Sequence, residues 1–337
     1  MQGRLVIDEI RSECLEGNLP GDPTTRQVPI YLPPSYDRDT GRQFAVIYTL
    51  AGYTGAGRSF LNYNCWSPTL PERVEALICD GRMPEVIVVM PDCMTAYGGG
   101  QYLNSSALGR YQDFLADEVV SHVDHAYRTI AHRDSRAVVG KSSGGYGALV
   151  LGMQRADRFG VVGCHAGDMY FEYCYLPDIP KAAAVISQHR GLVAFRNHFN
   201  LALRKKGADF TAMSIVAMAA AYSPHPNAQP YGFDLPFDES SSEFREDVWL
   251  RWLAHDPVRM LERREAADAL KSLRLLYLDV GTQDEYNLQL GARIFRDRLD
   301  RAGVAHVYEE FNDGHRDTGY RYDVSLPALA RALEGNE

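Results

Sequence analysis

Short apolar runs alternate with helix-length segments along most of this chain. Runs rich in β-branched and aromatic residues predict strands at residues 5–7, 28–31, 44–48, 86–90, 137–139, 161–163, 275–278 and 304–311. Several of these runs are apolar at every position, which is typical of strands covered by helices on both faces. Apolar side chains recur at helical spacing over residues 110–128, and helices are also expected at residues 147–153, 289–302 and 320–333.

This alternation predicts an α/β fold, with a mostly parallel central sheet and helices on both of its faces. The alternation of strands and helices stops between residues 168 and 265, where the sequence has helical patterns and many aromatic residues but no convincing strand. An insertion of this length between two core strands is most simply a helical cap over the strand ends. We therefore expect a single α/β domain over residues 1–337, with a cap insertion at about residues 168–265.

Composition and charge narrow the class of function. The 337 residues are 45% hydrophobic, enough for one sizeable core, and the formal net charge of −9 argues against nucleic acid or an anionic membrane as a partner. No apolar run approaches the roughly 20 residues that a membrane span needs. The first residues lack the apolar core of a signal peptide, so a cytoplasmic location is expected. The oligomeric state is left open, with a homo-oligomer among the options.

Residues 140–147, GKSSGGYG, follow an apolar run and allow two interpretations. A phosphate-binding loop would need a glycine five positions before the first of these residues, where Ser135 stands. The pattern G-x-S-x-G is complete, and it predicts that Ser142 is a nucleophile on a sharp strand-to-helix turn. Ser143 is the rival nucleophile, but Lys141 occupies the position where that alternative needs a glycine.

A serine hydroxyl becomes a good nucleophile when a histidine takes its proton and a carboxylate orients that histidine. In α/β-hydrolases the acid and then the histidine follow the serine along the chain. Asp284 and His315 each follow a predicted strand, in loops where ligands of open α/β sheets bind. They are the predicted acid and base. Asp284 could instead cap a helix, which would leave Glu285 or Asp279 as the acid; Asp279 lies within a strand and suits the role least.

The tetrahedral intermediate of such a reaction needs N–H donors for its oxyanion. We expect them from the backbones of Ser143, directly after the nucleophile, and of Tyr53, in the loop after the third predicted strand. A glycine before Tyr53 would let the chain turn back toward the serine. Four residues are predicted to contact the substrate, because they flank these groups or follow a strand end: Gly52, Tyr97, Gln101 and Lys141.

With these residues in place, the chain resembles the putative-esterase family of α/β-hydrolases. That family includes esterase D (S-formylglutathione hydrolase), feruloyl, acetylxylan and enterochelin esterases, and mycolyltransferases. The resemblance rests on RQVPIYLPPSY, TLAGYTG, VVMPD, GKSSGGYGAL, GTQDEY and GHRDT, which begin at residues 26, 49, 88, 140, 281 and 314. It implies the nucleophile Ser142, the acid Asp284 and the base His315. The family often has His, Leu or Gln in place of Lys141 and Met or Leu in place of Ser143, so the substrate stays open.

The expected function is hydrolysis of a small-molecule carboxylic ester through an acyl-enzyme, without a metal or an organic cofactor. The aromatic residues of the insertion favour an aromatic, feruloyl-like acyl group. A thioesterase of the S-formylglutathione hydrolase type and an acyltransferase are alternatives within catalysis, and a catalytically silent binding protein is the alternative outside it. His122, Asp124, His125 and the acidic residues 234–243 lack the ligand spacing of zinc or EF-hand calcium sites.

Overall fold

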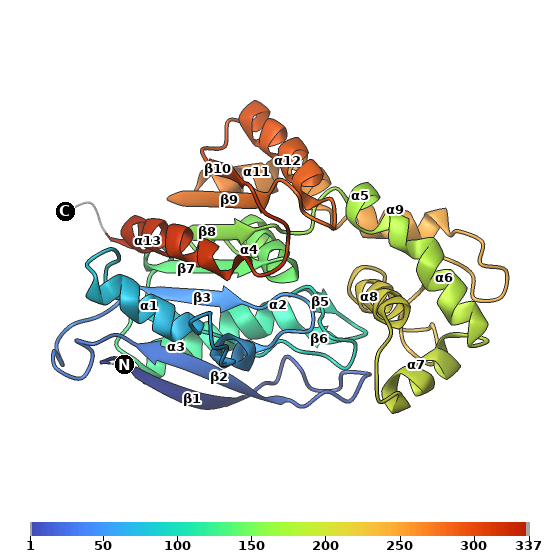
Figure 1. Ribbon diagram of the computed structural model, residues 1–337, viewed down its shortest axis with the longest axis horizontal. Helices are drawn as coiled ribbons and strands as arrows, with labels where there is room; N and C mark the ends of the chain where they lie inside the picture. The colour runs from blue at the N-terminus through green and yellow to red at the C-terminus, as the bar shows by residue number, and fades with distance from the viewer. Residues whose placement is uncertain (1, 335–337) are drawn as a thin grey trace.

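The computed structural model describes residues 2–334, and at its centre lies an eight-stranded sheet (Figure 1). The strand order is β1-β2-β4-β3-β7-β8-β9-β10. β1 (Arg4–Arg11) and β2 (Thr25–Leu32) form an antiparallel hairpin at one edge, and β2 pairs antiparallel with β4. The other strands run parallel: β4 (Ile87–Val89), β3 (Val46–Leu50), β7 (Arg136–Lys141), β8 (Val161–His165), β9 (Leu275–Gly281) and β10 (Val307–Phe311). The predicted strands and the mostly parallel sheet are confirmed.

Helices cover both faces of the sheet, because successive side chains of each buried strand point to opposite sides. Ala137 and Val139 of β7 pack with α1 (Leu70–Cys79) and α13 (Tyr322–Leu333), whereas Val138 packs with α4 (Ser143–Gln154) and its neighbours. α12 (Leu288–Ala302) lies on the same side as α4. The helix predicted over residues 110–128 is present, and its middle turn is π-helical: α2 (Tyr111–Asp113), Phe114–Val119, then α3 (Val120–Ala126).

The segment between β8 and β9 is helical, as the sequence predicts. Its helices are α5 (Phe171–Cys174), α6 (Ile179–Gln188), α7 (Leu192–Leu201), α8 (Gly207–Tyr222), α9 (Glu246–Leu253), α10 (Pro257–Met260) and α11 (Arg264–Lys271). In Figure 1, α6, α7 and α8 extend to the right of the sheet, next to the small ribbon of β5 (Asn104–Ser105) and β6 (Gly109–Arg110). Among the described residues, none of the helices combines the length and apolarity needed to cross a bilayer.

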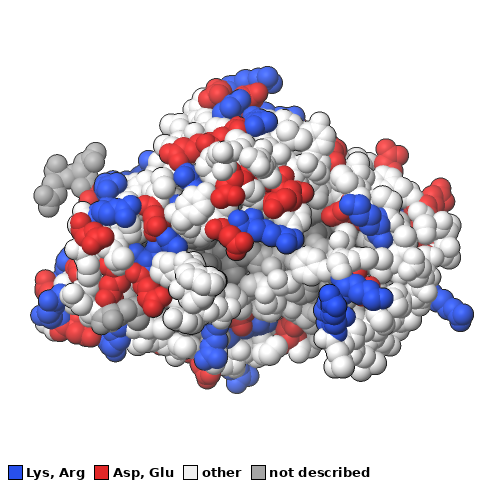
Figure 2. Space-filling model, in the orientation of Figure 1, with Lys and Arg blue, Asp and Glu red and all other residues white. Residues whose placement is uncertain are grey.

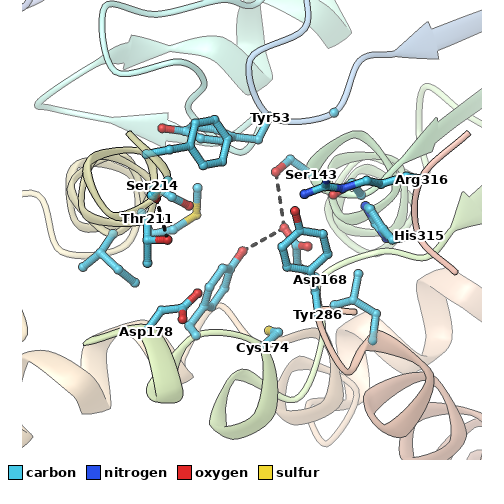
Figure 3. Close-up of a pocket in the computed structure, with 18 of the residues that line it drawn as sticks. Tyr53, Ser143, Asp168, Cys174, Asp178, Thr211, Ser214, Tyr286, His315 and Arg316 are labelled. Carbon is cyan, nitrogen blue, oxygen red and sulfur yellow. Dashed lines mark hydrogen bonds between the residues drawn. The ribbon is translucent and has the colours of Figure 1, made fainter. Parts of the chain in front are cut away.

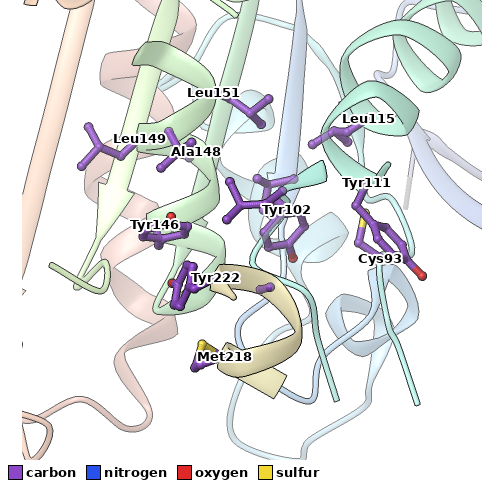
Figure 4. Packing of buried hydrophobic residues seen from close by; sticks show 14 of the residues in the cluster. Cys93, Tyr102, Tyr111, Leu115, Tyr146, Ala148, Leu149, Leu151, Met218 and Tyr222 are labelled. Carbon is purple, nitrogen blue, oxygen red and sulfur yellow. The ribbon is translucent and has the colours of Figure 1, made fainter. Parts of the chain in front are cut away.

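An aromatic cluster joins this segment to the helix that follows β7. Tyr146 of α4 lies 5.8 Å, ring centre to ring centre, from Tyr222 at the end of α8 (Figure 4). Phe171 and Trp252 contact the same tyrosine at 5.1 Å and 5.5 Å. Each aromatic pair of this kind stabilises a fold by about 0.5–1.5 kcal/mol beyond the area it buries. The cluster therefore fixes α8 relative to α4, and much of the aromatic content of the insertion serves packing.

His255 closes this cluster, with its imidazole stacked on Tyr222 at 5.5 Å. Burial, and to a lesser degree the Arg263 cation, lowers the pKa of His255 to about 4. The unfolded chain takes up a proton at an ordinary histidine pKa of about 6.5, so unfolding is favoured as the pH falls through this interval. We compare the free energy of unfolding of the wild-type protein with that of His255→Gln. We expect the difference, wild type minus variant, to fall by about 3 kcal/mol between pH 6.5 and pH 4. Urea unfolding of both proteins at several pH values measures it; parallel pH profiles would contradict it.

Candidate active site

Ser142 stands on a strained turn between β7 and α4. Its backbone angles are φ 58° and ψ −127°, a conformation that L-residues rarely adopt and that costs of order 1–3 kcal/mol. The glycines on either side are required by close backbone contacts. A Cβ atom at Gly140 would lie 2.4 Å from the Gly144 carbonyl oxygen, and a Cβ atom at Gly144 would lie 2.2 Å from that of Leu50. The turn presents the Ser142 side chain at the N-terminal end of α4.

His315 and Asp284 come from adjacent loops after β10 and β9, and both side chains are buried. His315 Nδ1 lies 2.7 Å from Asp284 Oδ2. An ionised Asp284 places the imidazole proton on Nδ1 and leaves Nε2 free to accept one. Ser142 and His315 line the same cavity. In the described part of the chain the Ser142 hydroxyl makes no hydrogen bond, and catalytic hydrogen bonds often form only once substrate is bound.

The two alternative acids are engaged elsewhere. Glu285 accepts a hydrogen bond from the backbone N–H of His315 at 2.6 Å, and this bond lowers the pKa of the Glu285 carboxyl. Asp279 Oδ1 lies 2.6 Å from His165 Nδ1, and Arg321 Nε donates to Asp279 Oδ2 at 2.9 Å. Of the three candidate carboxylates, only Asp284 hydrogen-bonds to the His315 ring.

A second arrangement of serine, histidine and aspartate is formed around His165. Its Nε2 lies 2.8 Å from Ser325 Oγ of α13, and its Nδ1 faces Asp279. All three side chains are buried, and none of them lines the cavity that contains Ser142. These hydrogen bonds therefore attach α13 to β8 and β9, and the buried Ser325 hydroxyl is out of reach of a substrate.

Tyr53 and Ser143 are the two residues whose backbone N–H groups the sequence predicts as oxyanion donors. Tyr53 and Ser143 line the cavity, and no acceptor for either backbone N–H is found among residues 2–334. A Cβ atom at Gly52 would lie 3.4 Å from the Ser142 Cβ atom, so the loop that contains Tyr53 runs directly against the nucleophile. The positive end of the α4 dipole adds to the attraction for an anion at this point.

The cavity in front of Ser142 has a volume of about 920 Å³. Strand ends and loops of the sheet form one wall, and α8 forms the opposite wall (Figure 3). Tyr286 and Leu288, before and at the start of α12, add apolar surface. The sequence did not indicate which helix of the insertion would line the cavity; the residues that α8 contributes are Gly207, Phe210, Thr211, Ser214, Ile215 and Met218.

Asp168 lies in the cavity wall next to Ser143, and it was also missed. Its Oδ2 accepts hydrogen bonds from Gln101 Nε2 at 2.9 Å, Tyr175 OH at 2.8 Å and Ser143 Oγ at 3.3 Å. Burial raises the pKa of the Asp168 carboxyl, although these hydrogen bonds oppose the shift. Asp168 follows the end of β8 much as Asp284 follows β9, and that position was the signal in the sequence that could have revealed it.

The four predicted substrate contacts divide into two pairs. Gly52 and Lys141 line the cavity, whereas Tyr97 and Gln101 do not. Tyr97 is buried, with the Arg196 guanidinium 4.5 Å from its ring centre, and Gln101 lies behind Asp168. The loop at residues 97–102 does follow a strand end, but the helical insertion covers it. The prediction that Tyr97 and Gln101 contact the substrate is therefore not supported by their positions.

One group of side chains in the described part of the chain could approach a metal ion: His189, His198 and Asp209, whose donor atoms lie within 4.8 Å of one another. Two donors about 2.0–2.2 Å from one zinc ion can be no more than roughly 4 Å apart. Within the group, His198 Nε2 and Asp209 Oδ2 lie 3.9 Å apart, so this pair satisfies that limit. The group lies around the N-terminal end of α8 and does not line the cavity. His122 pairs instead with Asp8 at 2.8 Å.

Comparison with known proteins gives the family of this chain. Residues 23–332 match the sequence model of a family described as putative esterase. The chain belongs to the putative-esterase family. Esterase MT1326 of Mycobacterium tuberculosis is 24% identical over 306 residues, which cover 88% of this chain and 54% of that protein. The chain thus spans about half the length of the curated relatives it matches.

Solved structures of esterases share the fold of this family member. A ferulic acid esterase superposes with a TM-score of 0.64 at 18% identity, over 99% of both chains. An S-formylglutathione hydrolase from Staphylococcus aureus gives a TM-score of 0.58 at 16% identity, over 98% of this chain and 99% of that one. The α/β-hydrolase fold and the family resemblance predicted from the sequence are both confirmed.

Proposed function

We propose that this member of the putative-esterase family is a serine hydrolase of small-molecule carboxylic esters. The observation that most supports the proposal is the strained Ser142 turn, which faces the same cavity as a histidine hydrogen-bonded to a buried aspartate. Membership of the family and the fold shared with solved esterases add to this support.

In the first half of the reaction, Ser142 Oγ attacks the ester carbonyl while His315 Nε2 takes the hydroxyl proton. Asp284 keeps the imidazole in the required tautomer and stabilises the imidazolium. The backbone N–H groups of Tyr53 and Ser143 donate to the oxyanion of the tetrahedral intermediate. His315 then returns the proton to the departing alcohol, and the acyl group remains on Ser142.

Water completes the reaction in the second half. His315 accepts a proton from the water as it attacks the acyl-enzyme, and passes that proton to Ser142 as the acid leaves. No step in this scheme calls on a metal or an organic cofactor. We further propose that residues 168–265 act as a cap within one catalytic domain, since α8 supplies one wall of the cavity.

An aromatic acyl group is the proposed substrate feature. Tyr53, Phe210 and Tyr286 line the cavity and offer flat apolar surface to an aromatic ring. Rates on feruloyl esters, short aliphatic esters and glutathione thioesters test this proposal under one set of conditions. A preference for the feruloyl ester is expected. A preference confined to the thioester would replace it with a thioesterase of the S-formylglutathione hydrolase type.

Labelling with a fluorophosphonate probe tests the catalytic proposal itself. The probe phosphonylates an activated serine, so we expect a single adduct on the peptide that contains Ser142. Turnover of p-nitrophenyl acetate should decline in proportion to labelling. A folded protein that neither reacts with the probe nor hydrolyses the ester would instead be a silent member of the fold.

A further inference from the structure

The charges in the cavity wall differ from those of the molecule as a whole. The chain has a formal net charge of −9. Four cationic side chains nevertheless line the cavity, Lys141, Lys205, Lys206 and Arg316, against the carboxylates of Asp168 and Asp178 and the base His315. In Figure 2, Lys and Arg side chains lie on both sides of the hollow at the middle of the face shown, with Asp and Glu among them.

The two carboxylates of the wall already have protein partners. Asp178 Oδ1 forms an ion pair with Lys181 Nζ at 2.8 Å. Asp168 accepts its hydrogen bonds from the neutral side chains of Gln101 and Tyr175, and burial raises the pKa of its carboxyl. Neither carboxylate therefore neutralises the cations of the cavity.

None of the four cations forms an ion pair with a carboxylate in residues 2–334, although Arg316 hydrogen-bonds to the Tyr286 side chain. Lys205 Nζ is engaged by the Ala202 carbonyl oxygen at 2.9 Å. For Lys141, Lys206 and Arg316, no carboxylate lies within 4.0 Å of a side-chain nitrogen anywhere in residues 2–334. Lys141 is the most informative of them, because it is partly buried and makes no side-chain hydrogen bond in the same part of the chain. A desolvated ammonium group is unfavourable unless an anion compensates it.

The sequence positions of these cations bring them close to the reacting atoms. Lys141 directly precedes Ser142, and Arg316 directly follows His315. Figure 3 shows Arg316 on the side of the cavity that contains Ser143 and His315, across from Thr211 and Ser214 of α8. A substrate whose carbonyl lies at Ser142 therefore has cationic groups beside it. Removal of either charge is expected to alter substrate choice.

We propose that this cavity selects esters carrying one carboxylate group, with Lys141 and Arg316 as the side chains that bind it. The inference rests on the proposed function. The Arg316 guanidinium offers two parallel N–H donors, which match a carboxylate. Burial lowers the pKa of Lys141, and the nearby carboxylates of Asp284, Asp317, Glu285 and Asp279 oppose that shift by favouring the charged ammonium. These carboxylates would repel a dianion such as a phosphate ester more strongly than a monoanion, which favours a single carboxylate.

Matched pairs of substrates test the proposal on the wild-type protein. On the acyl side, the methyl half-ester of adipic acid is compared with the methyl ester of its monoamide. On the alcohol side, 3-carboxyphenyl acetate is compared with 3-carbamoylphenyl acetate. We expect kcat/KM to be at least about tenfold higher for the acid in one pair, since hydrogen bonds to charged groups are the strong ones. The preference should weaken as ionic strength rises.

Variants assign the preference to the two cations. In Lys141→Met and Arg316→Gln the ratio of acid to amide should fall toward one, and Lys141→Arg should retain part of it. Lys271→Met on α11, an exposed residue outside the cavity wall, removes the same charge and should leave the ratio unchanged.

The failures of the two proposals can be told apart. Hydrolysis of acids and amides at equal rates would overturn the carboxylate proposal while leaving the hydrolase proposal standing. A preference that survives the loss of both cations would overturn the assignment of Lys141 and Arg316. Absence of turnover for all four esters, together with absence of fluorophosphonate labelling, would overturn both proposals.

Discussion

Ser142→Ala is expected to lower kcat for p-nitrophenyl acetate by about 10⁴-fold or more, with little change in thermal stability. The replacement removes the hydroxyl that is proposed to carry the acyl group, and losses of this size follow removal of a triad serine in other hydrolases. Alanine has the same backbone strain at φ 58° as serine, so the turn itself should persist. Initial rates and a circular dichroism melt of the same preparation measure both quantities.

Ser143→Ala is the matched control, because Ser143 is the rival nucleophile. In residues 2–334 its side chain makes one hydrogen bond, a 3.3 Å contact with Asp168, and alanine keeps the backbone N–H that is the predicted oxyanion donor. We expect a loss of less than about tenfold, within the range of one weak hydrogen bond. Equal inactivation of the two variants, or full activity in Ser142→Ala, would show that Ser142 is not the nucleophile.

Asp284→Asn is expected to lower kcat by about 10⁴-fold, the second large effect. The buried carboxylate accepts the Nδ1 proton of His315 at 2.7 Å, and an amide nitrogen in its place would stabilise the tautomer with the proton on Nε2. That tautomer cannot accept the Ser142 proton. KM should change much less than kcat, since Asp284 does not line the cavity.

Glu285→Gln separates the two neighbouring carboxylates. Glu285 accepts the backbone N–H of His315 and makes no contact with the ring, so its amide should preserve most of the activity. A loss below about tenfold is expected, again within the range of one hydrogen bond. If Glu285→Gln proved as inactive as Asp284→Asn, orientation of His315 would depend on the loop as a unit and not on Asp284 alone.

Much of the sheet could be predicted from the sequence because its strands are buried on both faces. Runs such as Val161 and Val162 in β8 or Leu276 in β9 have almost no exposed surface, and such strands leave an uninterrupted apolar signal. The order of Ser142, Asp284 and His315 along the chain was equally readable, since each lies just beyond a strand. Their chemical roles stay predictions that the variants above test.

The cavity wall was less predictable, because it depends on how separate elements pack. α8 is apolar on nearly all sides, so no periodic pattern indicates that Phe210 and Ser214 face the cavity while Ala219 is buried. The loop containing Tyr97 and Gln101 follows a strand end, a position where ligands often bind, but the insertion covers it. Tertiary contacts override local rules at such positions.

Ser325, His165 and Asp279 have a practical consequence for recognising enzymes by shape. A geometric template built from the hydrogen bonds of a hydrolase triad would match this internal arrangement, where both ring nitrogens of His165 are bonded, and that match would be a false positive. The same template would pass over Ser142, whose hydroxyl makes no hydrogen bond in residues 2–334. The hydrogen-bonded pair of His315 and Asp284 differs because the His315 ring lines the cavity that also contains Ser142. A serine, histidine and aspartate arrangement in this fold can therefore act on a substrate only where a cavity lets the substrate reach the serine.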